Sequence, residues 1–599
     1  MTALSRRAPL AGWIAVVLMG ALAIAIGWDR GPDPLVDFGR ELYVSWRLTE
    51  GDVLHRDIAW FNGPLGPWAL EGWTRLFGVS VDAVQAMNAA VIALTAAALG
   101  RACAVIAGQL AAGLAAWLFL VAFAVSQKGS AESFLFLAPY SHGITLGFLC
   151  GLLALLLLHR FSERGTRRAA FATGALLGLA FLSKAEIFLG AALGAGAMVT
   201  AQLVAPTEEA RGWRRRLVAW SALGFVSAIG GAAARFVAQL GPAELPAALA
   251  GTWIHAFDPS ITGGDFYRTM RGTDDVGRSL ARVGTTTAGI AVFVAAIMAA
   301  AGMIDRRARD ARVAAAVALG VASTTTVAAF TQAHLRWMLL PLVIFLPGLV
   351  VARGAGALRR RKEGLDARGL LLLGFACFAA GLLPKILLVP MARQYGFVLT
   401  VPGAMLLVCL LVRWIPDTMA RRGARPGTLA AAGAGIVLVF GAMNAFATLQ
   451  RLRREDGALG TGPDRVIGES WMTDTLAEVT REVAPLLGSD DRLLVLPEGI
   501  MLNYQLRRRT PTGILNFMPP ELSMFEQREI IAAMEQAPPA VVVLVKRPTD
   551  VYGYPFFGEG YGEELLAWVR ANYEREQLVG HEPFARGWAE FGAEILLPR

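Results

Sequence analysis

The chain has 599 residues, of which 55% are hydrophobic and only 17% are charged, and its mean hydropathy is +0.50. Soluble domains carry about 25% charged residues, so this composition excludes a soluble globular protein and predicts a polytopic α-helical membrane protein. The net charge of +9 does not indicate nucleic-acid binding, because residues 448–599 hold 16 Lys and Arg against 23 Asp and Glu. The basic excess lies before them, mostly in short loops between apolar segments, which is a topology signal of membrane proteins.

About thirteen membrane-spanning helices are expected, because a hydrocarbon core requires about 20 apolar helical residues. The expected spans are 10–28, 82–101, 103–126, 141–159, 169–183, 186–205, 217–240, 284–304, 312–331, 337–353, 369–389, 395–413 and 428–447. Short cytoplasmic loops carry an excess of Lys and Arg. With a cytoplasmic N-terminus, thirteen spans place all five arginine-rich loops in the cytoplasm, near 160–168, 211–216, 306–312, 359–362 and 421–425.

The same count places the long polar segments on the extracytoplasmic face. We therefore expect a transmembrane domain over 1–447 and an extracytoplasmic domain over 448–599. Three further segments face the same side, at 29–81, 127–140 and 241–283. Because this face carries most of the mass outside the spans, the functional residues are expected there.

The first extracytoplasmic loop holds several carboxylates beside the bilayer surface. Residues 36–48 have the pattern of an amphipathic interfacial helix, with Asp37 near its start, and Asp57 lies in the Gly/Pro-rich turn that follows. If helix and turn pack together, Asp37 and Asp57 share one neighbourhood, where a carboxylate can act as a general base toward a hydroxyl. Such a pair can instead hold a divalent cation, the one cofactor that the sequence leaves open.

The alternative for this loop is structural. In that interpretation Asp37 pairs with Arg40, and Glu41 pairs with Arg47, as acids and bases of an interfacial helix commonly do. Spacing alone does not separate the structural from the catalytic interpretation.

Several ionisable side chains lie at the outer ends of the expected spans, against the usual charge bias. Charges in membrane segments are costly and are usually functional or paired. Cations that converge at the outer surface suit a lipid-borne phosphate, and the candidates are Lys184, Arg336, Lys385 and Arg393. The alternative is a structural ion pair between Lys184 and Glu186, with the other cations reaching to the interface. His142, at the start of a span, is more typical of a hydrogen-bonding helix end than of a base.

The C-terminal region alternates strand and helix patterns and is expected to form a small α/β domain. Strands are expected at 492–497, 540–545 and 593–597, with helices at 471–487, 521–536 and 562–575. The region has no Gly-rich phosphate loop and no nucleophile elbow. We therefore expect it to cover the site or to bind an acceptor.

The segments Val-Asp37-Phe-Gly-Arg40-Glu41-Leu-Tyr and Leu-His-Arg56-Asp57 before Gly63-Pro64-Leu-Gly-Pro resemble the GT-C class of membrane glycosyltransferases. The resemblance is nearest to bacterial members of the glycosyltransferase 39 type, relatives of protein O-mannosyltransferases and aminoarabinose transferases. Lys184-Ala-Glu186 is a further similar element. Protein O-mannosyltransferases place Asp and Glu in adjacent positions, whereas Asp37 is followed by Phe38, which leaves the role of Glu41 open.

This resemblance implies a GT-C-like fold in a bacterial inner membrane and a sugar donor carried on a polyprenyl phosphate. It implies inverting transfer to a hydroxyl of a lipid, glycan or protein acceptor on the periplasmic face, with Asp37 as base and Asp57 in support. Lys184, Arg336, Lys385 and Arg393 would bind the donor phosphate, and the candidates for other substrate contacts are Arg40, Glu41, Glu186 and His142. Membrane lipids are the expected surroundings, and no nucleic-acid partner is expected.

Three rival interpretations remain open from the sequence. A transporter or lipid flippase would require charges near the bilayer midplane and often inverted repeats, and neither is evident. A glycan polymerase or ligase would place its long catalytic loop late in the membrane domain. A non-enzymatic scaffold would use the C-terminal domain as its binding module.

Overall fold

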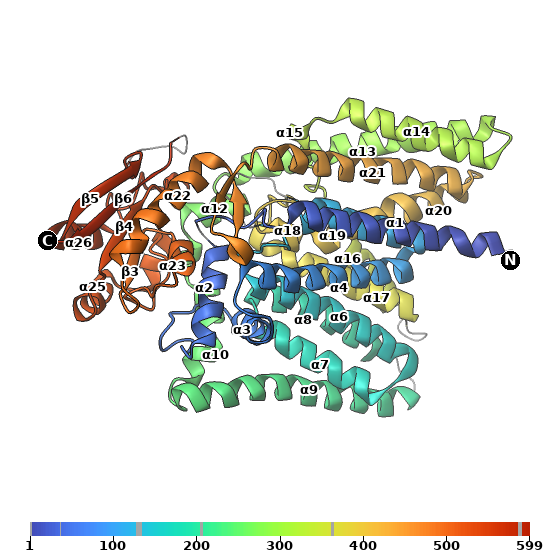
Figure 1. Cartoon of the computed structure of the whole chain (residues 1–599). Helices are drawn as coiled ribbons and strands as arrows, with labels where there is room; N and C mark the ends of the chain where they lie inside the picture. The colour runs from blue at the N-terminus through green and yellow to red at the C-terminus, as the bar shows by residue number, and fades with distance from the viewer. Residues whose placement is uncertain (1–2, 36, 127–133, 204–207, 361–364, 585–589) are drawn as a thin grey trace.

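A computed structural model describes residues 3–35, 37–126, 134–203, 208–360, 365–584 and 590–599. An elongated bundle of helices forms one part of the molecule, and a smaller α/β domain caps one end of it (Figure 1). The N-terminus lies at the opposite end of the bundle, where α13 also turns into α14. The molecule therefore has a helical part and a C-terminal part that contains both strands and helices.

Each expected span corresponds to a helix. The helices at the expected spans are α1 (Ala3–Gly27), α4 (Val81–Ala107), α5 (Gln109–Phe119), α6 (His142–Arg164), α7 (Arg167–Phe181), α8 (Ala185–Leu203), α9 (Glu208–Leu240), α13 (Val276–Arg307), α14 (Ala311–Ala329), α16 (Leu342–Arg359), α17 (Ala367–Leu382), α19 (Val401–Cys409) and α21 (Pro426–Leu452). Among the described residues, ten helical segments are long and apolar enough to cross a membrane, and 12–27 and 109–124 are shorter apolar helices. The polytopic helical fold predicted from composition is confirmed.

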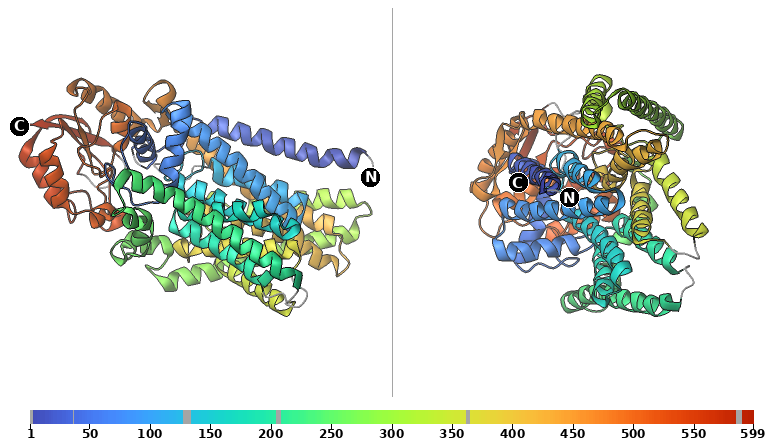
Figure 2. Two further views of the ribbon diagram at one scale, coloured as in Figure 1. Left: turned by 90° about the horizontal axis from the view of Figure 1, so that it is seen from below. Right: turned by 90° about the vertical axis from the view of Figure 1, so that its right-hand side faces the viewer.

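The outer helices of the bundle present apolar side chains outward. Val226 of α9, Val292 of α13 and Val351 of α16 are 64%, 70% and 69% exposed. Burying such side chains is worth about 1.5–3 kcal/mol each, so their exposure is explained when lipid surrounds these helices. Helices α4, α6, α17 and α21 are mostly buried within the bundle, and Figure 2 shows the helices of the bundle lying side by side along the long direction of the molecule.

Shorter helices gather at the end of the bundle that the C-terminal domain covers (Figure 1). They are α2 (Phe38–Thr49), α3 (Leu65–Phe77), α10 (Leu245–Phe257), α11 (Pro259–Thr262), α12 (Asp265–Arg271), α15 (Gln332–Leu335) and α18 (Gly396–Leu399), and α20 (Ile415–Ala420) lies at the other end. The α2 helix is buried on almost all sides. It is therefore an internal helix between the two parts of the molecule and not the lipid-facing interfacial helix that its pattern predicts.

The C-terminal domain contains a four-stranded sheet with the order β3-β4-β6-β5. Its strands are β3 (Leu493–Leu496), β4 (Val541–Val545), β5 (Tyr573–Gly580) and β6 (Gly592–Pro598), and the helices are α22 (Ser470–Val483), α23 (Ile500–Leu506), α24 (Pro519–Met524), α25 (Gln527–Gln536) and α26 (Glu563–Asn572). A two-stranded ribbon of β1 (Gly457–Leu459) and β2 (Val466–Gly468) links it to α21. Strands β3 and β4 are parallel, with Leu493 opposite Val541, so their carboxyl ends meet at one edge of the sheet.

That edge is fixed on the first loop by close backbone contacts. A Cβ added to Gly39 of α2 would lie 2.8 Å from the Cα of Met501 in α23, so only glycine permits this approach. The amide of Thr510 donates to the hydroxyl of Tyr43 (3.0 Å), and the amide of Ala59 donates to the carbonyl of Gly513 (2.9 Å). The C-terminal domain and the first loop therefore form one continuous structure.

Candidate active site

Asp37 lies between the bundle and the C-terminal domain, at the N-terminus of α2. An Asp in this position usually caps the helix by accepting a backbone hydrogen bond, but the Asp37 side chain makes none. Its backbone has φ 40°, an uncommon conformation for a residue other than glycine. Its carboxylate lies 3.4 Å from Nη2 of Arg40, which also donates to the carbonyl of Tyr140 (3.0 Å). The predicted Asp37–Arg40 pair is present, and 28% of the Asp37 side chain remains accessible.

The surroundings of Asp37 make its carboxylate a stronger proton acceptor than an exposed aspartate. Burial raises the pKa of Asp37 above its ordinary value, against the opposing charges of Arg40, Arg547 and Lys184. Efficient general bases have pKa values near the working pH. An accessible carboxylate with a raised pKa therefore has the properties that a base toward a hydroxyl requires.

Glu41 is held deep in the protein by His142. Its Oε2 accepts from the backbone amide of His142 (2.9 Å) and lies 2.9 Å from the Nδ1 atom of the same residue. Burial acts to raise the pKa of Glu41, but the hydrogen bonds and charge of His142, with the charge of Arg40, hold it below its ordinary value. The Glu41 side chain is only 1% exposed and has His142 as its partner.

The pair between Glu41 and Arg47, which the structural alternative predicts, is therefore wrong. Arg47 instead makes a bidentate pair with Asp52, with two N–O distances of 2.8 Å. The helix turns Glu41 toward α6 and Arg47 toward the end of the loop, so the two side chains of α2 serve different contacts.

Lys184 and Lys385 lie near the N-terminal end of α2, which carries Asp37 and Glu41. Nζ of Lys385 lies 2.6 Å from Oε1 of Glu186 and 4.3 Å from the ring centre of Tyr395. Nζ of Lys184 lies 4.7 Å from the ring centre of Tyr140, and the rings of Tyr140 and Tyr395 are 5.5 Å apart. The structural alternative paired Glu186 with Lys184, whereas the structure pairs Glu186 with Lys385, which lies on a different helix.

The local fold places Lys184 next to the first loop. The amide of Gly63 donates to the carbonyl of Ser183 (3.0 Å), and a Cβ at Gly63 would lie 2.2 Å from the carbonyl oxygen of Leu182. Burial lowers the pKa of Lys184 to about 7, and the charge of Lys385 acts in the same direction. An anion that binds between the two ammonium groups would relieve this repulsion.

The C-terminal domain adds charged side chains at the carboxyl edge of its parallel strands. Glu498 follows β3 and Arg547 follows β4, with 2.8 Å between Nε of Arg547 and Oε2 of Glu498. Burial raises the pKa of Glu498 to about 8 and that of Glu521 to about 7. The charges of Glu498, Glu521 and Arg547 all act on the Asp37–Arg40 pair, so the domain forms a wall of the site.

Sequence reasoning missed Glu498, Glu521 and Arg547. A signal for two of them exists, because ligands in α/β folds bind at the carboxyl ends of parallel strands. Glu498 directly follows the expected strand 492–497, and Arg547 is the second residue after the expected strand 540–545. We find no comparable local signal for Glu521, which reaches the site from α24.

The structure does not bring Asp57 to Asp37. The Asp57 carboxylate accepts from Arg56 (2.8 Å) and from the amide of Val53 (2.8 Å), beyond the C-terminal end of α2. Asp37 precedes the other end of this 12-residue helix, which at 1.5 Å per residue is about 18 Å long. Asp57 therefore holds the turn after α2, and Asp37 remains the candidate base.

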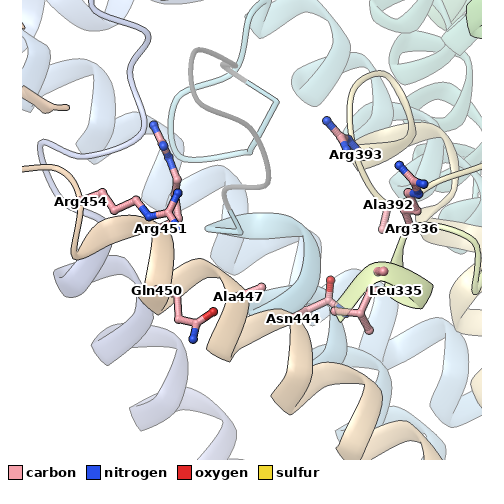
Figure 3. A pocket seen from close by; sticks show the side chains of 10 residues that line it. Leu335, Arg336, Ala392, Arg393, Asn444, Ala447, Gln450, Arg451 and Arg454 are labelled. Atoms are coloured by element: carbon pink, nitrogen blue, oxygen red, sulfur yellow. The ribbon is translucent and has the colours of Figure 1, made fainter. Parts of the chain in front are cut away.

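Arg336 and Arg393 line a pocket whose lining does not include the two lysines. This pocket of about 450 Å³ is also lined by Arg451 and Arg454 at the end of α21, as Figure 3 shows. The four cations expected to bind one donor phosphate thus form two groups. Lys184 and Lys385 adjoin the Asp37 site, and Arg336 and Arg393 belong to the arginine pocket.

A divalent cation was the one cofactor left open by the sequence. Within the part of the chain that the structure describes, no three His, Cys, Asp or Glu side chains come together as a set that could hold a metal ion. Of the acids at the candidate site, Asp37 has Arg40 as its partner and Glu41 has His142 as its partner.

Comparison with known proteins gives structural likenesses only. No protein-family model matches the chain, and no curated protein sequence matches it. The structure of ArnT from Cupriavidus metallidurans bound to undecaprenyl phosphate is similar over 98% of both chains, at 16% identity and a TM-score of 0.43. The Archaeoglobus fulgidus oligosaccharyltransferase in complex with zinc and sulfate is similar over 88% of this chain and 68% of its own, at 13% identity and a TM-score of 0.45.

Both of these proteins are GT-C glycosyltransferases, the class that the first-loop motif resembles. TM-scores of this size carry no argument about chemistry, which rests on the geometry of the Asp37 site.

Proposed function

We propose that this protein is a membrane glycosyltransferase that moves a sugar from a polyprenyl-phosphate donor to an acceptor hydroxyl. The observation that carries the proposal is the accessible carboxylate of Asp37, with its raised pKa, close to the lysines that adjoin the first loop. A base and an anion site in one place are what glycosyl transfer from a phosphate requires. The bound undecaprenyl phosphate of the similar ArnT structure supports the same class of lipid.

The reaction would proceed by direct displacement. The acceptor hydroxyl gives its proton to Asp37 while its oxygen forms a bond to the anomeric carbon of the sugar. The bond between this carbon and the donor phosphate oxygen breaks, and the phosphate leaves with both bonding electrons. Attack opposite to the leaving group inverts the anomeric centre, and Lys184 and Lys385 stabilise the negative charge that develops on the phosphate.

Neighbouring groups hold this machinery in place. Arg40 is linked both to Asp37 and to the Tyr140 carbonyl, so it orients the base. The Glu41–His142 pair, fully buried beneath it, fixes α2 against α6. Glu186 balances Lys385 and keeps its ammonium group beside Tyr395.

The cellular setting follows from the topology expected from the arginine-rich loops. The Asp37 site and the C-terminal domain lie at the end of the bundle opposite the N-terminus (Figure 1). With a cytoplasmic N-terminus, this end faces the periplasm of a bacterial inner membrane, and the donor enters from the outer leaflet. The acceptor is a lipid, glycan or protein that carries a hydroxyl group.

The test is an Asp37→Asn variant of the full chain in proteoliposomes. The probe is a polyprenyl-phosphate sugar labelled in the sugar, offered with a membrane extract as the source of acceptors, and the readout is released polyprenyl phosphate. Loss of a general base lowers rates by about 10²–10⁴-fold, while donor binding should persist. Asp490→Asn, in an exposed turn of the C-terminal domain, is the matched control and should retain full activity. Full activity in Asp37→Asn would exclude the assignment.

A further inference from the structure

The lining of the arginine pocket does not include Asp37, Lys184 or Lys385, and it comes from three separate segments. Arg336 follows the short helix α15, Arg393 lies in the loop before α18, and Arg451 and Arg454 lie at the end of α21. Figure 3 shows Arg451 and Arg454 on one side of the pocket and Arg336 and Arg393 on the other. The volume of about 450 Å³ is within the range of ligand sites, about 300–1,000 Å³.

Nearby acids balance only part of this positive charge. Arg451 pairs with Glu469 and lies 4.0 Å from Glu455. Burial raises the pKa of Glu455 to about 7, and this residue also lies 3.8 Å from Arg30. Among the described residues, Arg336 and Arg454 form no salt bridge; Arg336 lies over the ring of Trp337, 4.9 Å from its centre. The pocket is therefore cationic.

The composition of the wall changes along the pocket. Arg451 and Arg454 lie where α21 leaves the expected span, whereas Leu335, Ala392 and Ala447 provide an apolar wall. Asn444 and Ala447 belong to the span itself. The planar guanidinium group of arginine binds phosphate oxygens in pairs, and an apolar wall beside it suits the start of a lipid chain.

From these observations we propose that the arginine pocket binds the phosphate headgroup of a second membrane lipid, other than the sugar donor. Lys184 and Lys385, which adjoin Asp37, are not among its lining residues. Lys385 is already paired with Glu186 and stacked on Tyr395. The two cationic sites are thus built from different side chains, and this proposal does not depend on the transfer reaction.

The test measures equilibrium binding of radiolabelled short-chain phosphatidic acid to the full chain in neutral detergent. Arg336→Gln/Arg393→Gln removes two charged hydrogen-bond donors and should weaken binding on the order of 10–100-fold. Arg454→Gln, exposed at the end of α21, should weaken binding in the same direction and reports on the site if the double variant folds poorly. The matched control is Arg278→Gln, whose side chain is 73% exposed at the start of α13 and which should bind like the unaltered protein.

Three further measurements identify the ligand. Diacylglycerol with the same chains should not compete, and inorganic phosphate should compete only weakly, because the apolar wall contributes to lipid binding. Polyprenyl phosphate should still bind the double variant through Lys184 and Lys385. Unchanged phosphatidic acid binding in the double variant would overturn the proposal, and so would inorganic phosphate binding as tightly as the lipid. Loss of polyprenyl phosphate binding in that variant would instead make the pocket the donor site.

Discussion

Replacing Gly39 by alanine tests whether the C-terminal domain positions the active site. The added Cβ would lie 2.7 Å from the Cβ of Met501, 2.8 Å from its Cα and 2.9 Å from its N. Two of these atoms are backbone, so no side-chain rotation relieves the contact. Ordinary contacts begin at 3.4 Å, so α23 must move away from α2 by about 0.6 Å or more.

The loss of folding stability in Gly39→Ala follows from this displacement. Overpacking of a close contact costs about 1–3 kcal/mol, and the better helix propensity of alanine returns about 0.5–1 kcal/mol. The net loss of stability is therefore at most about 2.5 kcal/mol. Because Glu498 lies two residues before the start of α23, it moves with that helix. Misplacement by 1 Å can lower a rate by about 10²-fold, so a loss of about tenfold in transfer is expected.

Thermal unfolding and release of polyprenyl phosphate measure the two effects separately. Gly72→Ala is the matched control, because Gly72 is also helical and a Cβ there meets nothing within 4 Å. It should be as stable as the unaltered protein or slightly more so, and fully active. If Gly39→Ala behaves like this control, the close approach of α2 and α23 is not as described. If it lowers stability without slowing transfer, the C-terminal domain does not position the site.

Two further predictions concern pH. Because burial lowers the pKa of Lys184 to about 7, binding of polyprenyl phosphate should weaken as the pH rises through about 7. The side chain of the Lys184→Arg variant stays charged, so a binding titration of this variant should not show that dependence on pH. Because burial raises the pKa of Glu498 to about 8 from an ordinary value of 4.5, the folded chain binds more protons than the unfolded chain between these values. Stability should therefore fall as the pH rises from 4.5 to 8, and Glu498→Gln should remove part of that slope in thermal unfolding; an unchanged slope would contradict the assignment.

The sequence determined the architecture, because membrane spans depend on local composition. A run of about 20 apolar residues must form a helix in lipid wherever it occurs, so every expected span has its helix in the structure. Three of the four strands in the C-terminal sheet were also predicted, since short runs such as Val541–Val545 are rich in β-branched residues. Strand β5 was not predicted, and its first residues were assigned to a helix. Asp37 could be selected as a candidate because its loop follows the first span.

Only the tertiary structure decided which charges meet. Glu41 pairs with His142 across 101 residues of sequence, and Lys385 pairs with Glu186 across 199. Helix spacing suggests partners three or four residues away, such as Asp37 and Arg40, but contacts between elements depend on how the helices pack. For the same reason, the wall that Glu498 and Arg547 supply depends on how the C-terminal domain docks on the bundle. The different linings of the arginine pocket and of the lysine site depend on the packing of the same elements. No local pattern encodes this docking.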